Sequence, residues 1–264
     1  MRALVIVLSM VAILVTANSV KANQRIAFVV GNGAYKYTQR LPNAPISAKA
    51  MTRLLQSIGF EVVEGIDLTR DKMTDRLLDF GKKAEGADVA LFFYTGHAIA
   101  INGTNYLLPI DADIKSEMDV KLGAAINIDL TVDQTMSDAK IKLVFLDTSR
   151  ENPFVRNGQS DRSVSVQSGL AEMKVGEGTL IAFATGPGQT APDGPVGSIR
   201  PFTRALIANI AAPGVEIQLA MTKVRAQVND ETNAKQSSRE FTNLLADFYL
   251  NPVAAAPIAP TTAK

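Results

Sequence analysis

The chain contains no cysteine and no tryptophan, and it has a single histidine among its 264 residues. Without a thiol the protein can form no disulfide and can carry out no thiolate chemistry. A transition-metal site made of cysteine and histidine ligands is also excluded, because one imidazole cannot supply the ligand set. Folding must therefore depend on the hydrophobic core, and a hydrophobic content of 47% at this length is ample for one.

A surplus of either charge is also missing. The 27 Lys and Arg residues nearly balance the 26 Asp and Glu residues, which gives a formal net charge of +1. Proteins that bind nucleic acid or anionic membranes carry a basic patch or stripe, and no such stripe is visible along this chain. We therefore expect no nucleic-acid partner.

The amino end has the three-part pattern of a secretory signal. Arg2 is followed by an apolar run from Ala3 to Val15, and small and polar residues then lead to Val20 and Ala22. The alternative is an uncleaved membrane anchor, but the run is shorter than the about 20 residues that span a bilayer. We predict a signal peptide at 1–22, a mature protein that is secreted or periplasmic, and no stable membrane span after signal removal.

Strand-like and helix-like segments alternate along the rest of the chain, which favours an α/β fold with a mostly parallel central sheet and helices on both faces. Asn102-Gly103 predicts a hairpin turn within 98–110. One domain is expected over 23–250, followed by a disordered Pro/Ala-rich tail at 251–264. The predicted strands are 25–31, 61–66, 88–96, 142–147, 178–185 and 240–250, and the predicted helices are 47–60, 70–85, 198–211 and 214–229.

Two of these strands deliver polar residues to their carboxyl ends, where active sites of open α/β sheets lie. His97 follows the strand at 88–96, and Ser149 follows the strand at 142–147. In caspases a histidine lies about 50 residues upstream of the nucleophile, and 149 − 97 gives 52 here. This spacing makes His97 and Ser149 candidate catalytic residues.

Several ordered motifs resemble the bacterial caspase-like cysteine peptidases, the metacaspases and orthocaspases. "LFFYTGHAIAINGTNYLLPIDA" is similar to their histidine strand and hairpin, and "LVFLDTSRENPF" is similar to their nucleophile strand. "GTLIAFATGPGQTAPDG" and "PFTRALIANIAAPGVEI" resemble the two blocks that follow. The resemblance extends from about residue 24 to 250 and implies a caspase-like fold.

The resemblance also implies roles for single residues. His97 falls on the catalytic histidine and Ser149 on the catalytic cysteine. Asp147 falls on the acidic residue that helps the substrate pocket hold a basic side chain, and Thr95 falls on a further pocket position. A protein or peptide with basic residues is therefore an expected partner.

Three positions depart from the family pattern. The nucleophile position holds Ser149, the oxyanion position after the histidine holds Ala98 in place of glycine, and Ser47 stands where a second pocket acid is expected. Alanine keeps the backbone N–H donor provided that its φ is negative. A serine hydroxyl, unlike a thiol, needs a well-aligned base that a third group orients. We expect this change to remove most of the catalytic rate.

Three functional hypotheses remain. The first is a peptidase homologue that has lost catalysis and acts by binding. The second is an active endopeptidase or other hydrolase that uses a Ser149-His97 dyad. The third is an interaction module that works through other surfaces or through the long connection at 150–178.

Other motifs carry little weight, and no cofactor is expected. "GNGAYK" and "GPGQTA" only partly match dinucleotide-binding loops. "DADIKSEMD" could hold Ca²⁺ weakly, although a solvated acidic loop is the favoured interpretation. Its carboxylates are Asp111, Asp113, Glu117 and Asp119.

Overall fold

The computed structural model describes residues 23–149, 170–186 and 191–253, and the backbone of three two-residue strands between them. For Ser149 only the backbone is described. The predicted signal peptide and most of the predicted tail lie outside these residues. Within the described ranges, no helix combines the length and the hydropathy that crossing a bilayer requires.

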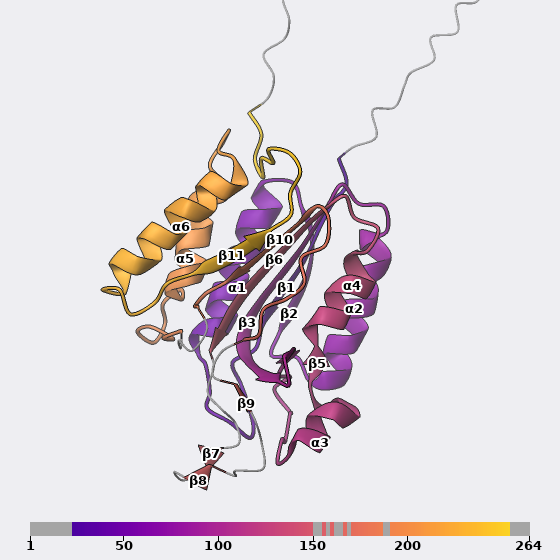
Figure 1. Ribbon diagram of the computed structural model, residues 1–264, viewed down its shortest axis with the longest axis vertical. Helices are drawn as coiled ribbons and strands as arrows, with labels where there is room; N and C mark the ends of the chain where they lie inside the picture. Colours follow the sequence, from indigo (N-terminus) through magenta and orange to yellow (C-terminus); the bar gives the residue numbers. More distant parts are fainter. Residues whose placement is uncertain are drawn as a thin grey trace, which may run out of the picture.

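A twisted, mostly parallel sheet forms the centre of the molecule, as predicted (Figure 1). Five of its strands run parallel, and the edge strand β11 pairs antiparallel with β10. The strand order is β11 (Arg239–Thr242), β10 (Thr179–Phe183), β6 (Ile141–Ser149), β3 (Val89–Ile101), β1 (Arg25–Gly31) and β2 (Glu61–Ile66). The last predicted strand, 240–250, is shorter than expected, because β11 ends at Thr242.

The strand that carries His97 is longer than the sequence predicted. β3 does not end at Gly96 but continues through His97 to Ile101, where it turns at Asn102-Gly103 into β4 (Thr104–Leu107). Asn102 and Gly103 have φ values of 50° and 79°, as a hairpin turn with two left-handed residues requires. The hairpin prediction is confirmed, but its first strand is the end of β3.

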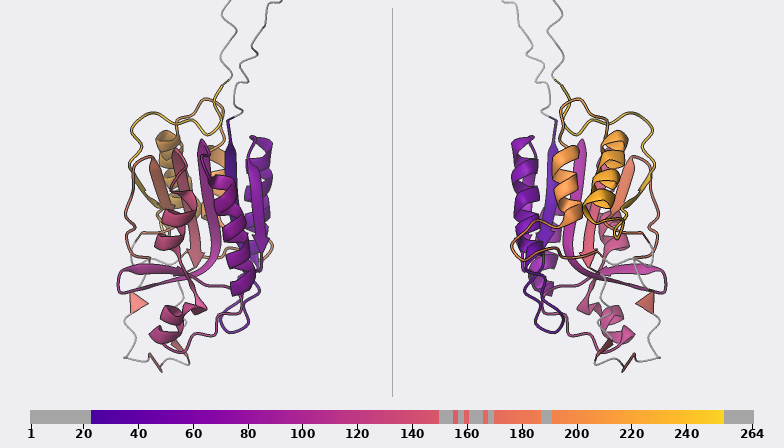
Figure 2. Two further views of the ribbon diagram at one scale, coloured as in Figure 1. Left: turned by 90° about the vertical axis from the view of Figure 1, so that its right-hand side faces the viewer. Right: turned by 90° about the vertical axis from the view of Figure 1, so that its left-hand side faces the viewer.

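Helices cover both faces of the sheet (Figures 1 and 2). One face carries α1 (Asn43–Ser57), α5 (Pro201–Asn209) and α6 (Ile217–Glu231). The other carries α2 (Arg70–Ala84) and α4 (Ile128–Met136). α4 was not predicted, and neither were α3 (Glu117–Asp119), the π-helical turn η1 (Val120–Ala124) and β5 (Ile126–Asn127). Three short strands lie in the connection at 150–178: β7 (Val155–Arg156), β8 (Gln159–Ser160) and β9 (Val166–Gln167).

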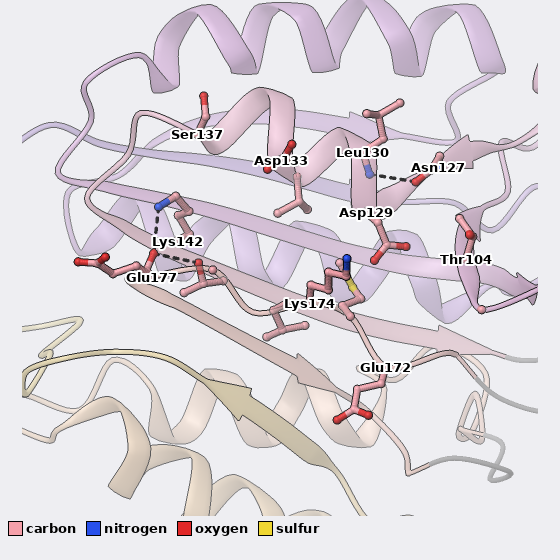
Figure 3. Close-up of a pocket in the computed structure, with 16 residues that line it drawn as sticks. Thr104, Asn127, Asp129, Leu130, Asp133, Ser137, Lys142, Glu172, Lys174 and Glu177 are labelled. Atoms are coloured by element: carbon pink, nitrogen blue, oxygen red, sulfur yellow. Dashed lines mark hydrogen bonds between the residues drawn. The ribbon is translucent and has the colours of Figure 1, made fainter.

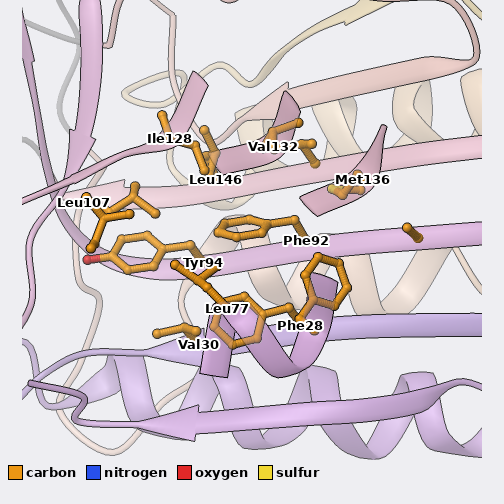
Figure 4. Packing of buried hydrophobic residues seen from close by; sticks show 14 of the residues in the cluster. Phe28, Val30, Leu77, Phe92, Tyr94, Leu107, Ile128, Val132, Met136 and Leu146 are labelled. Carbon is orange, nitrogen blue, oxygen red and sulfur yellow. The ribbon is translucent and has the colours of Figure 1, made fainter. Parts of the chain in front are cut away.

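Alternate residues of the strands separate the core into two layers. Phe28 and Phe92 point to the α2 and α4 side, where the predicted helix-face residues Met73, Leu77 and Phe80 cover them (Figure 4). The neighbouring strand residues point to the α1, α5 and α6 side and form a second cluster. Burial of each large apolar side chain contributes roughly 1.5–3 kcal/mol. The two layers hold β3 and β6 rigidly, and these two strands carry the candidate catalytic residues.

Candidate active site

The register between β3 and β6 brings the candidate residues together. His97 pairs with Ser149, and Thr95 pairs with Asp147, at the carboxyl ends of two adjacent parallel strands. Side chains two residues apart on a strand share a face of the sheet. His97 and Thr95 therefore share the face of Phe93, which is the face covered by α1, α5 and α6. Asp147 lies on the same face, because it follows Phe145 of that face by two residues along β6.

Two tyrosines hold the backbone of His97. The His97 N–H donates to Tyr35 Oη over 2.8 Å, and Tyr94 Oη donates to the His97 carbonyl over 2.9 Å. The two phenol oxygens lie 3.1 Å apart and share the carbonyl of Leu108. Burial raises the pKa of both tyrosines above the usual value, so both remain neutral hydrogen-bonding groups.

Gly96 makes this tyrosine pair possible. A Cβ atom at this position would lie 2.6 Å from both phenol oxygens, which is closer than any ordinary contact. The glycine before His97 is therefore explained by the close approach of Tyr35 and Tyr94.

The His97 imidazole is buried, with 1% of its surface exposed, and its ring packs on Tyr35 at a centroid distance of 4.6 Å. Its Nε2 lies 2.8 Å from the carbonyl oxygen of Gln39. Because a carbonyl can only accept a hydrogen bond, Nε2 carries the proton in the neutral ring, and Nδ1 is the basic nitrogen. Gln39 thus orients the imidazole, but its carbonyl supplies no negative charge to stabilise an imidazolium ion.

Ala98 has a negative φ, which is the condition under which its backbone N–H can serve as an oxyanion donor. The His97 carbonyl accepts a hydrogen bond from the Leu108 N–H, so the backbone groups of His97 are directed toward the β4 side of β3. Neighbouring residues of a strand direct their backbone groups to opposite edges. The Ala98 N–H is therefore directed to the β6 edge of β3, where Ser149 ends the neighbouring strand.

Asp147 lies beneath the candidate catalytic pair in a buried polar cluster that the sequence did not reveal. Its side chain is 1% exposed, and its Oδ1 accepts from Arg200 Nε over 3.0 Å. Its Oδ2 accepts from the hydroxyl of Thr203 over 2.5 Å. The Arg200 guanidinium is completely buried and also donates through Nη1 to Asp193 over 2.8 Å.

The two other predicted pocket residues border the same cluster. Ser47, on α1, accepts a hydrogen bond from the backbone N–H of Arg200 over 3.0 Å. Thr95 is fully buried, and its hydroxyl has no hydrogen-bond partner in the described part of the chain, as is also true of Arg200 Nη2. The structure thus brings Thr95, Asp147 and Ser47 together, but around an internal arginine. Their roles in substrate binding stay predictions.

The fold and the sequence are both similar to those of known proteins. The caspase domain family matches residues 24–249 of the chain. The chain belongs to the caspase family of cysteine peptidases. Its structure superposes on the crystal structure of the Drosophila initiator caspase Dronc with a TM-score of 0.61, 14% sequence identity, and coverage of 87% of this chain and 84% of that chain.

Two curated relatives match over a shorter stretch. Mucosa-associated lymphoid tissue lymphoma translocation protein 1 of Homo sapiens is 27% identical over 97 residues, and its Mus musculus homologue is 28% identical over 91 residues. These alignments cover 37% and 34% of this chain, but 12% and 11% of the relatives' own lengths. The resemblance stated from the motifs, and the caspase-like fold that it implied, are therefore confirmed.

The acidic segment of this caspase domain is a capped loop. Asp119 and Ser116 form a capping box at the start of α3, and hydrogen bonds from the backbone N–H groups of Lys115 and Ser116 lower the pKa of Asp119. The other three carboxylates have separate partners in the backbone of Arg70 and the ammonium groups of Lys115 and Lys121. In the described ranges, no group of three or more acidic or imidazole side chains is placed to hold a metal ion.

A cavity of about 770 Å³ lies on the opposite face of the sheet, beside α4 (Figure 3). Its lining includes Val132 and Ile181, which belong to the core layer on the α2 and α4 side. Asp129 lies at the wall of this cavity, where burial raises the pKa of its carboxyl group and the N–H of Asn105 donates to it. This cavity is separate from the face that holds His97.

Proposed function

We propose that this protein is a caspase-domain protein without peptidase activity, which is exported and acts by binding a protein or peptide. One observation carries the proposal: a member of a cysteine peptidase family contains no cysteine at any position. The thiolate that performs the attack in such enzymes is therefore missing, and no other residue of the chain can supply one.

The surroundings of His97 support the loss of catalysis. A serine nucleophile depends on a base whose protonated form is stabilised during attack, commonly by a buried carboxylate. Here the group behind the imidazole is the neutral carbonyl of Gln39. Attack by a serine at this position would therefore lack the charge stabilisation that the carboxylate supplies in serine proteases.

The alternative of a Ser149-His97 hydrolase has one observation in its favour. The tautomer that Gln39 imposes makes Nδ1 the basic nitrogen, and the Ala98 N–H is directed to the edge where Ser149 lies. A base and an oxyanion donor therefore remain in place. The two hypotheses differ in whether this residual arrangement turns over substrate.

The test compares three proteins: the unaltered chain, Ser149→Cys, and Ser149→Cys/His97→Ala. Each is incubated with a library of peptides, and new termini are identified by mass spectrometry. The proposal predicts no cleavage above background by the unaltered chain. A fluorophosphonate that labels Ser149 in the unaltered chain, and fails to label His97→Ala, would instead establish the serine hydrolase.

Export is a separate part of the proposal, and it depends on the signal pattern at 1–22. The expected product is a protein that begins at Asn23 in the periplasm or the medium. Expression in a bacterial host, followed by fractionation and amino-terminal sequencing, tests this directly. An uncleaved chain retained in the membrane fraction would contradict it.

A further inference from the structure

The space beside Asp147 and Thr95, called the recess below, adjoins the candidate catalytic pair. Asp147 precedes Ser149 by two residues on β6, and Thr95 precedes His97 by two on β3. Residues at this separation lie about 6.6 Å apart along one face of a sheet. A chain bound across His97 and Ser149 could therefore direct one side chain along this face toward the Asp147 carboxylate.

Arg200 occupies that recess from within the protein. Its guanidinium donates from Nε to Asp147 Oδ1 over 3.0 Å, and none of its side chain is exposed. Thr203, one turn further along α5, donates to the other carboxylate oxygen. Each oxygen of Asp147 thus already has a donor, and one of the two donors carries a positive charge.

A loop at 191–200 holds the arginine in place. Asp193 accepts from Arg200 Nη1, and the Asn43 amide donates to the carbonyls of Asp193 and Pro195 over 2.8 Å each. The Asn43 side chain also accepts from Gly197 N–H over 2.8 Å. These bonds connect the loop to the start of α1. The position of Arg200 is therefore determined by contacts with β6, α5 and, through the loop, α1.

The charges in this recess oppose entry of a second cation. An incoming Arg or Lys side chain would lose its hydration, yet Asp147, the carboxylate that it would reach, is already paired with Arg200. It would also lie close to the like charge of the guanidinium, without water to screen the repulsion. An uncharged side chain would suffer neither penalty.

We propose that Arg200 is a built-in occupant of the substrate recess, and that it excludes arginine and lysine side chains from the candidate binding site. The inference deepens the proposed binding function and rests on it. It reverses the expectation of a partner with basic residues that the family resemblance suggested for Asp147.

The experiment uses peptides as probes and requires no catalysis. The chain has no tryptophan, so the fluorescence of a peptide that contains one reports binding without background from the protein. Acetyl-Trp-Ala-Ala-Arg-amide is compared with the same peptide ending in norleucine, which has a similar stem and no charge. Both are titrated with the unaltered protein, Arg200→Ala, Arg200→Ala/Asp147→Asn, and, as a matched control, Arg204→Ala in the first turn of α5.

The proposal predicts that the unaltered protein and Arg204→Ala do not favour the arginine peptide. Arg200→Ala should gain at least tenfold in affinity for the arginine peptide over the norleucine peptide, because Asp147 becomes free to pair with it. Addition of Asp147→Asn should abolish that gain. An unaltered protein that already prefers arginine, or a folded Arg200→Ala variant without the gain, would overturn the inference.

Removal of Arg200 leaves a buried carboxylate unpaired and can prevent folding. Circular dichroism therefore accompanies each titration. If Arg200→Ala is unfolded, Arg200→Ser takes its place, because a hydroxyl can donate to Asp147 while leaving most of the recess open. Failure of this inference leaves the peptidase assays unaffected, and peptide cleavage by the unaltered protein would refute the proposed function without bearing on Arg200.

Discussion

Two neighbouring polar networks at the carboxyl end of the sheet differ in their charge. Around His97 the partners in the described part of the chain are neutral: two phenol hydroxyls and the carbonyl of Gln39, with the Leu108 carbonyl accepting from both phenols. Around Asp147 the partners are an arginine and, through it, a second carboxylate. The first network orients the imidazole through neutral groups, whereas the second holds its charges in internal ion pairs. His97 therefore lies among neutral hydrogen-bonding groups, while Arg200 fills the space beside Asp147.

The largest expected effect comes from breaking the charged network. Asp147→Ala leaves Arg200 buried without its main counter-ion, and loss of one partner of a buried pair costs about 3–5 kcal/mol. Denaturant unfolding followed by circular dichroism measures the change. The matched control is Glu231→Ala, which removes the partner of the partly exposed Arg204 and should cost about 0–1 kcal/mol. Equal losses of unfolding free energy in Asp147→Ala and Glu231→Ala would contradict a special role for the buried ion pair.

A smaller effect is expected where the neutral network meets Gly96. In Gly96→Ala the new methyl group would collide with the hydroxyls of Tyr35 and Tyr94, and overpacking of this kind costs about 1–3 kcal/mol. Gly81→Ala, in the interior of α2, is the control, because the nearest atom would lie at an ordinary 3.5 Å. That control should stabilise the helix by up to about 1 kcal/mol. A neutral or stabilising Gly96→Ala would show that the tyrosine pair does not constrain His97.

The smallest effect is expected from one hydroxyl of the neutral network. Tyr94→Phe removes the donor to the His97 carbonyl and should cost about 1 kcal/mol at neutral pH. Burial raises the pKa of Tyr94 above its unfolded value of 10.0, so the stability that its neutral form contributes is present below pH 10 and is lost as pH rises further. Unfolding free energies measured at increasing alkaline pH should therefore fall less steeply for Tyr94→Phe than for the unaltered protein. If the unfolding free energies of the two proteins fall equally with pH, Tyr94 does not contribute through a buried neutral hydroxyl.

Most of the scaffold was predictable from hydrophobic pattern. The strands at 25–31 and 61–66 have the predicted bounds, and the predicted face of α2 is the buried face. α4 was missed because it is only nine residues long, although its buried residues Ile128, Val132 and Met136 keep a helical period. The continuation of β3 past His97 was not predictable from the pattern, because a glycine such as Gly96 ordinarily indicates the end of a strand.

The candidate site was predictable only in part. His97, Thr95 and Asp147 were predicted at the carboxyl ends of two strands. They come together because these two strands are parallel neighbours in the sheet. Arg200 could not be predicted as their neighbour, because arginine is among the residues least often buried and its partner lies 53 positions away along the chain. Only the three-dimensional structure shows that an internal side chain fills the place beside Asp147.

The central claim concerns peptide cleavage by the unaltered protein. The most direct measurement counts new peptide termini that the purified protein generates from a denatured proteome, beside the Ser149→Cys and His97→Ala forms. The account predicts that the unaltered protein and His97→Ala are indistinguishable from a blank. Saturable cleavage by the unaltered protein that disappears in His97→Ala would contradict it.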